Sequence, residues 1–207
     1  MDYLTLCQTA RQRAGMSGAG PAQVTGNSGE MARLVDWVRM AWLDMQAIRT
    51  DWRPLWRQLS QAVTVGQPDV TATADMGHPI PERFRFDGAH LRWYAWRDFP
   101  AHEVEDGTPV AITRRPDGAL MLWPTPDSAG TLTGEYHATP QVLTNDADEP
   151  WLPRHLQDGI IHEALVLYGA YEDAPEIVQY HSAKADQFRQ RMANELLAVA
   201  ELGGSLA

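Results

Sequence analysis

The sequence predicts an α+β protein that is mainly helical, with about four helices and an inserted antiparallel β meander. Both ends of the chain carry apolar residues at three- and four-residue spacing, which is the period of one helix face. The middle holds short β-prone runs separated by Gly, Pro and Asp. At 207 residues the chain is long enough for one domain with its own core. We therefore expect a single domain over residues 1–207, with a β-rich insertion over about 55–140.

Two helices are expected before the insertion. The first covers about 2–14, with Asp2 as its N-cap and Gly15 as its stop. The Gly-rich loop that follows lacks the Lys-Ser/Thr of a phosphate-binding loop, so we assign no nucleotide site to it. The second helix covers about 28–50, because its apolar residues form one continuous stripe: Met31, Leu34, Val35, Val38, Ala41, Trp42, Met45 and Ile48.

The β-rich middle is predicted from turn residues and β-prone runs. Asp117-Gly118 tolerates the positive φ that a tight hairpin needs, so it joins the two runs on either side of it. Together with the next run these make a three-stranded antiparallel meander, whereas residues 70–83 are expected to be a loop. The expected strands are 56–65, 84–86, 91–96, 110–115, 119–123 and 131–138.

Two more helices are expected after the insertion. Residues 144–150 form an acidic connector, which we interpret as solvated because an EF-hand's glycine and terminal Glu are missing from it. The third helix covers about 152–171, and proline is well tolerated in its first turn. The fourth covers about 175–200, and Gly203-Gly204 ends it.

Charge and cysteine usage exclude several classes of protein. The net charge is −10 and the pI is near 5.0, which argues against a protein that grips nucleic acid by neutralising phosphates. One cysteine, Cys7, allows no disulfide within the chain and fits a reducing cytoplasm. It is expected to be a small buried apolar residue. No apolar run of about 18 residues predicts a membrane span, and the first residues lack a secretion signal.

No catalytic, cofactor or metal site is predicted, so we expect a protein that is not an enzyme. His162-Glu163 resembles the start of a zinc protease motif, but Val166 stands where the second histidine would be. His155 and His162 share a helix face, and a cryptic hydrolase that uses them is the alternative from a different class. We favour an exposed or interfacial polar face, because a catalytic site needs convergent groups.

Several local patterns combine in order along the chain. They are Gly18-Ala19-Gly20-Pro21, Leu34-Val35-Asp36-Trp37-Val38, Ala41-Trp42, Arg49-Thr50-Asp51-Trp52, Pro116-Asp117-Gly118-Ala119-Leu120-Met121-Leu122-Trp123-Pro124-Thr125-Pro126, Gly134-Glu135-Tyr136, Pro150-Trp151-Leu152-Pro153 and Tyr168-Gly169-Ala170-Tyr171-Glu172-Asp173-Ala174. Over about residues 1–195 the chain resembles the head-to-tail adaptor, or connector, proteins of tailed bacteriophages and prophages. The match is weakest over residues 66–109.

The resemblance implies a structural virion protein. Such a protein forms a homo-oligomeric ring, usually of twelve copies, between the portal and the tail in the phage neck, and extends the DNA channel. It is made in the host bacterial cytoplasm and serves DNA packaging and ejection. The implied partners are other copies of the chain, the portal, and tail or other neck proteins, without a membrane. DNA passes without specific binding, and we expect an acidic lumen to favour this.

The resemblance also leads to two hypothetical surfaces. The C-terminal helix and tail of these adaptors commonly engage the portal, so portal docking is expected at Phe188, Met192, Leu196, Leu202 and Leu206. Tryptophans outside the main apolar stripes suit contacts that are buried only in the ring, so the subunit interface is expected at Trp37, Trp93, Trp96 and Trp123. Another neck or tail completion protein, such as a stopper or tail terminator, is the alternative within the same class.

Overall fold

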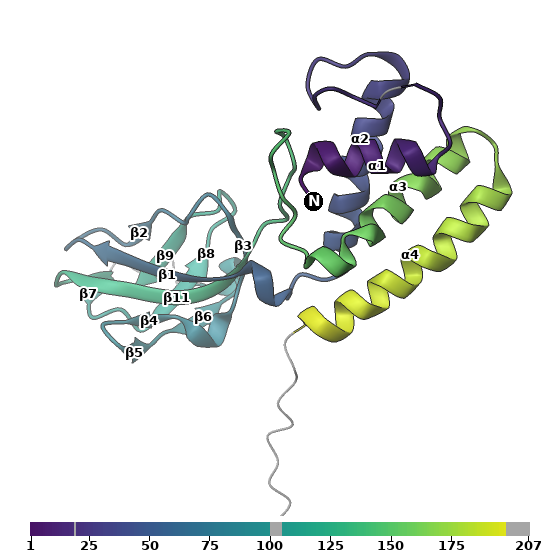
Figure 1. Ribbon diagram of the computed structural model, residues 1–207. Coiled ribbons are helices and arrows are strands. Elements are labelled where there is room, and N and C mark those ends of the chain that lie inside the picture. The colour runs from purple at the N-terminus through teal and green to yellow at the C-terminus, as the bar shows by residue number, and fades with distance from the viewer. Residues whose placement is uncertain (19, 100–104, 198–207) are drawn as a thin grey trace, which may run out of the picture. The chain divides into compact units, whose positions relative to one another are not determined.

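The computed structural model describes residues 1–18, 20–99 and 105–197 (Figure 1). They form two compact units. The helical unit comprises Met1–Pro54 and Pro140–Ala207, and the β unit comprises Leu55–Thr139. About 41% of the chain is helical and 23% is strand, so the predicted α+β class is confirmed. That the two units act as one adaptor domain stays a prediction.

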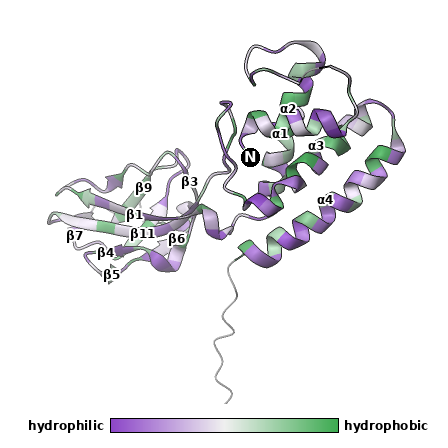
Figure 2. Cartoon of the chain, viewed as in Figure 1, coloured by the Kyte–Doolittle hydropathy of each residue, from purple (hydrophilic) through white to green (hydrophobic). Residues whose placement is uncertain are grey.

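The helical unit contains the four expected helices. Their bounds are α1 Tyr3–Arg13, α2 Gly29–Ala47, α3 Asp158–Tyr171 and α4 Pro175–Leu196. Asp2 caps α1, because its carboxylate accepts a hydrogen bond from the Thr5 backbone N–H at 2.7 Å. In α4 hydrophilic and hydrophobic residues alternate along the helix, as Figure 2 shows. This pattern fits a helix that packs through one face only.

Helix α3 begins later than residue 152, where we expected it. Pro153 is extended, with ψ near 141°, and the 3₁₀ turn Arg154–Leu156 follows it. The Gln157 side chain then donates to the Leu152 carbonyl at 2.9 Å. A helix cannot run through an extended residue, so the first full turn starts at Asp158. At the other end α4 is described to Leu196, and residues 198–200 of the expected helix lie outside the described residues.

Buried Gln46 joins α2 to the segment that returns from the β unit. Its side-chain oxygen accepts hydrogen bonds from the Gln141 backbone N–H at 2.8 Å and from the Trp151 indole at 2.9 Å. Its amide nitrogen donates to the Gln141 carbonyl at 2.9 Å. The Trp151 ring also lies 4.9 Å from the Trp42 ring and 6.2 Å from the Trp52 ring, between ring centroids. These contacts fix residues 140–151 against α2.

The β unit contains short strands in three sheets. The first sheet has the strand order β1-β11-β4-β5, and β3 also pairs with β11. The second has the order β2-β9-β8-β6, and the third consists of β7 and β10. Most pairs are antiparallel, but β6–β8 and β7–β10 are parallel. The bounds are β1 Trp56–Val63, β2 Asp69–Val70, β3 Met76–Pro79, β4 Arg85–Phe86, β5 Ala89–His90, β6 Arg92–Tyr94, β7 Asp106–Gly107, β8 Ala111–Arg114, β9 Leu120–Trp123, β10 Thr125–Pro126 and β11 Gly130–Ala138.

The hairpin forms as predicted, but the strand after it pairs elsewhere. Strands β8 and β9 are antiparallel around Gly118, whose φ is +92°. Strand β11 leaves this sheet and pairs with β1 along the whole length of β1. Pro124 and Pro126 lie between β9 and β11 and have no N–H to donate, so the ladder does not continue directly into a third strand. The expected loop over 70–83 also contributes β3 to the sheet of β11.

Candidate functional site

The described chain has no group of three or more His, Cys, Asp or Glu side chains that could hold a metal ion. Among the helices of these residues, none is long and apolar enough to cross a bilayer. Cys7 is fully buried, and burial raises the pKa of its thiol to about 12. The described residues also present partly exposed aromatic and charged surfaces, which suit contacts with other macromolecules.

An aromatic patch lies on α2 and α3 and comprises Trp37, Tyr168 and Tyr171, and Met40 lies one turn after Trp37 on α2. The Trp37 ring centroid is 6.0 Å from that of Tyr168 and 5.5 Å from that of Tyr171. Tyr171 is 54% exposed and Met40 is 46% exposed. Arg33 on α2 lies over the Tyr171 ring at 4.7 Å and donates to its hydroxyl. The patch is thus already ordered in one copy while much of its apolar surface faces solvent, as in many interfaces.

The other expected interface tryptophans lie in the β unit. Trp93 is half-buried and packs against Phe84, with ring centroids 5.1 Å apart. Trp96 is 39% exposed and its ring is stacked 6.4 Å from that of Phe99. Trp123 is half-buried at the end of β9. The four tryptophans therefore do not form one surface within a unit, and their role in subunit contacts stays a prediction.

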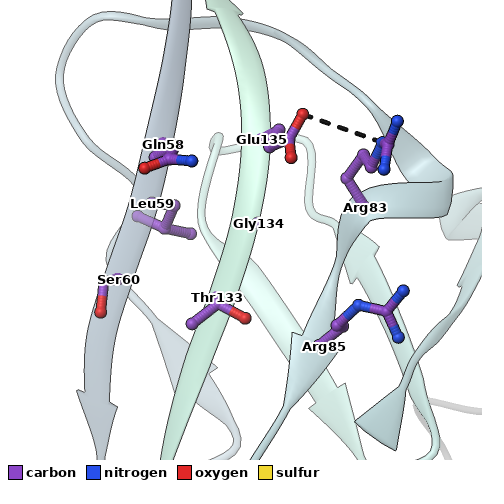
Figure 3. A pocket seen from close by; sticks show the side chains of 8 residues that line it. All are labelled: Gln58, Leu59, Ser60, Arg83, Arg85, Thr133, Gly134 and Glu135. Atoms are coloured by element: carbon purple, nitrogen blue, oxygen red, sulfur yellow. Dashed lines mark ion pairs between the residues drawn. The ribbon is translucent and has the colours of Figure 1, made fainter. Parts of the chain in front are cut away.

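A shallow polar hollow of about 290 Å³ lies on the sheet of β1, β11 and β4 (Figure 3). Glu135 on β11 points toward Arg83, and its carboxylate oxygen lies 3.8 Å from the guanidinium. The same oxygen accepts a hydrogen bond from the Trp56 indole at 3.0 Å. A Cβ on Gly134 would lie only 2.5 Å from the Phe84 ring, so glycine is needed where this ring crosses β11.

A basic groove of about 530 Å³ lies on the helical unit. It is lined by Arg13, His162, Tyr180, His181, Lys184, Gln187, Phe188 and Arg191, from α1, α3 and α4. Lys184 is the sole lysine of the sequence. Arg13 also forms an ion pair with Asp158 at 3.0 Å, whereas the lining residues include no carboxylate.

Two histidines contact each other in the basic groove. The Nδ1 atoms of His162 and His181 are 2.8 Å apart. Burial, and then the charges of His181 and Arg13, lower the pKa of His162 to about 4. Burial, and then Arg13, also lower the pKa of His181. Both rings are therefore neutral near pH 7, where the Nδ1–H of one ring donates a hydrogen bond to the Nδ1 of the other.

His155 and His162 have different partners on α4. His155 Nε2 lies 2.9 Å from a carboxylate oxygen of Glu195, in an exposed ion pair. His162 instead contacts His181, which sequence reasoning did not single out. The pairing of α3 with α4 creates this contact, and nothing in the local sequence around His181 indicates it.

The residues expected to dock onto the portal are in different environments. Met192 is 0% exposed and Leu196 is 8% exposed, so both belong to the core of the helical unit. Phe188 is half-buried. A Cβ added to Gly159 would lie 2.8 Å from the Cβ of Phe188, so α3 and α4 approach closely there. Leu202 and Leu206 lie outside the described residues. Substitutions at Met192 and Leu196 are therefore expected to affect folding as well as any docking.

The described residues bring no catalytic constellation together, and both units have partly exposed aromatic or charged surfaces. These features are typical of a structural protein that works through contacts, and the sequence resemblance predicts such a protein in the phage neck. The family model described as SU10 adaptor protein matches residues 1–205. The chain therefore belongs to this family of phage head-to-tail adaptors, which is a structural family of the virion's head–tail junction. No curated protein matches the chain significantly.

Proposed function

We propose that the chain forms a homo-oligomeric ring of twelve copies between the portal and the tail, where the ring extends the DNA channel. The observation that carries this proposal is the match to the SU10 adaptor protein family over residues 1–205, almost the whole chain. A ring is closed by rotation and uses two different surfaces of each subunit. The helical unit offers more than one distinct surface, since the aromatic patch lies on α2 and α3 and the basic groove lies largely on α4.

The predominance of helix supports an adaptor over another neck protein. A stopper or tail terminator is expected to be richer in strand, whereas this chain is about 41% helical and 23% strand. All four described α-helices lie in one compact unit, which provides long, rigid contact surfaces.

The portal is the proposed partner of the C-terminal region. Residues 198–207, which include Leu202 and Leu206, follow α4. Truncation after Leu197 removes Leu202 and Leu206 and leaves the described core complete. The truncated chain is expected to keep its helical circular dichroism and to lose at least tenfold in portal affinity. Unchanged portal affinity would mean that docking uses another surface.

DNA is proposed to pass through the ring without specific binding. The net charge of −10 repels the phosphate backbone, and phosphate contacts by Lys and Arg provide most of the non-specific affinity for DNA. A labelled duplex is expected to show no saturable binding to the chain at physiological salt. Binding that weakens steeply as salt is added would contradict this.

Co-purification tests the adaptor proposal. A tagged copy of the chain is expressed in cells that produce the virus, and mass spectrometry identifies the proteins retained with it. The proposal predicts that portal and neck proteins are recovered. Recovery of tail-tube proteins without portal would favour a stopper or terminator, and recovery of no virion protein would contradict a role in the neck.

A further inference from the structure

We propose that the basic groove of one copy binds the acidic turn between α3 and α4 of a second copy, and that this pair of surfaces is a subunit contact of the ring. The acidic turn comprises Glu172, Asp173 and Glu176. This inference rests on the proposed ring, since it names the surfaces that join neighbouring subunits.

The basic groove has two cations that form no ion pair with an acidic side chain among the described residues. Neither Lys184 nor Arg191 forms an ion pair with a carboxylate of the residues that the structure describes, although Arg191 lies 5.4 Å over the Phe188 ring. The two cations are seven residues apart on α4, so they lie on the same helix face about 10 Å apart. Two cations on one helix face suit an acidic ligand.

The histidine pair adds a hydrogen-bond donor to the groove. His162 and His181 are both neutral, and the Nδ1–H of one ring donates to the Nδ1 of the other. The ring that accepts this hydrogen bond therefore carries its own proton on Nε2. That N–H is left to donate to another acceptor, such as a carboxylate. The groove thus combines two cations with a neutral donor, and this favours a carboxylate over an apolar side chain.

The acidic turn is exposed and well ordered. Its three carboxylates form no ion pair with a cation within residues 1–18, 20–99 and 105–197. The Glu172 N–H donates to the Tyr168 carbonyl at 3.0 Å, and the Ala174 N–H donates to the Gly169 carbonyl at 2.9 Å. An ordered turn loses little conformational entropy when it binds.

The position of Glu172 is unfavourable in the isolated copy. Glu172 caps the C-terminus of α3, where the partial negative charge of the helix end repels it, whereas Glu176 lies in the first turn of α4, where the helix dipole favours a carboxylate. Cations from a second copy would relieve this repulsion.

Within the described residues, the carboxylates of the acidic turn form no ion pair with Lys184 of their own copy. Glu176 and Lys184 lie on the same helix, eight residues apart, which is about 12 Å along the axis. Each copy thus presents one groove and one turn that bind other copies. Such a pair of different surfaces is a head-to-tail contact, which closes into a ring when the rotation between copies is suitable.

Cross-linking at the single lysine tests the inference. A carbodiimide joins a carboxylate to an amine only where the two are in contact, so the expected links involve Lys184 or the N-terminal amine. Full-length chain labelled with ¹⁵N is mixed with unlabelled chain, both alone at high concentration and with purified portal. We expect peptide pairs of mixed isotope composition that join Lys184 to the acidic turn. Absence of such mixed-isotope pairs would overturn the inference. Mixed-isotope links from Lys184 to other carboxylates would also overturn it.

A charge exchange between two variants tests the same contact independently. One variant carries Lys184→Glu with Arg191→Glu, and the other carries Glu172→Lys with Glu176→Lys. Each variant alone is expected to self-associate at least tenfold more weakly than the native chain in sedimentation, and an equal mixture is expected to recover most of the loss. Arg154→Glu, an exposed change elsewhere on the helical unit, is the matched control and is expected to leave association unchanged. A mixture that associates no better than its components would refute the pairing.

The outcomes separate this inference from the proposed adaptor function. Portal binding without cross-links between copies at Lys184 would leave the adaptor function standing and overturn the inference. Links from Lys184 to the portal, or protection of Lys184 by duplex DNA, would assign the groove to those partners and also overturn it. Cross-links between copies without any portal binding would support the contact and contradict the adaptor function.

Discussion

Replacing Gln46 with methionine is expected to destabilise the helical unit by about 3 kcal/mol. Gln46 is 1% exposed, and its side chain bonds both backbone groups of Gln141 and the Trp151 indole. Methionine has a similar length and volume, so the change removes the hydrogen bonds without a large cavity.

The expected magnitude follows from the groups left without partners. The substitution leaves the Gln141 N–H, the Gln141 carbonyl and the Trp151 indole N–H unpaired. A buried group that loses its partner costs about 1–3 kcal/mol. Gln141 is only half-buried, so water can partly replace its lost bonds, and the lower end of the range applies. Three groups at about 1 kcal/mol each give the total of about 3 kcal/mol.

Urea unfolding followed by circular dichroism at 222 nm measures this loss, because all four described α-helices lie in the helical unit. With a slope of about 2 kcal/mol per molar, the midpoint should fall by about 1.5 M. Gln190→Met, on the exposed face of α4, is the control and should change stability by less than about 0.5 kcal/mol. A loss below about 1 kcal/mol for Gln46→Met would refute the reasoning.

Three further predictions follow from burial and close contact. Because the pKa of His162 is lowered to about 4 from the 6.5 of an unperturbed His, the unfolded chain binds more protons between these values. The shift from 6.5 to about 4 corresponds to at most about 3.4 kcal/mol, and solvent screening of the half-buried ring reduces this to about 1–2 kcal/mol. This contribution to the free energy of unfolding in urea should be fully present above pH 6.5 and be lost as the pH falls toward 4. The loss should be smaller in His162→Gln. Gly134→Ala places a Cβ 2.5 Å from the Phe84 ring, so the β unit should lose about 1–3 kcal/mol of stability. Thermal unfolding followed by near-ultraviolet circular dichroism measures this loss, and Gly107→Ala, whose Cβ has room, should change it little. Cys7 should react with a thiol reagent only as fast as the chain unfolds, and rapid labelling in native buffer would contradict its burial.

Local patterns in the sequence were sufficient to predict the helices and the hairpin. The apolar spacing in α2 and the capping role of Asp2 depend on residues a few positions apart, and both are present in the structure. Asp117-Gly118 likewise produces the β8–β9 hairpin from its own turn geometry. The later start of α3 shows where local reasoning fails, because the extended Pro153 competes with an otherwise helical pattern.

Contacts between distant segments could not be predicted from one sequence. Strand β11 pairs with β1 across more than sixty residues, and neither strand has a local feature that selects the other. The basic groove likewise exists only because α3 and α4 pack together and bring His181 to His162. The burial of Met192 and Leu196 has the same origin, since periodicity indicates an apolar face but not what covers it.

Imaging of the chain with its purified portal tests the central claim most directly. The account predicts a ring of copies of this chain that is coaxial with the portal and continues its channel. The density of each subunit in this ring should fit the helical unit. Particles that contain the portal alone, or that hold the chain away from the portal axis, would contradict the proposed adaptor function.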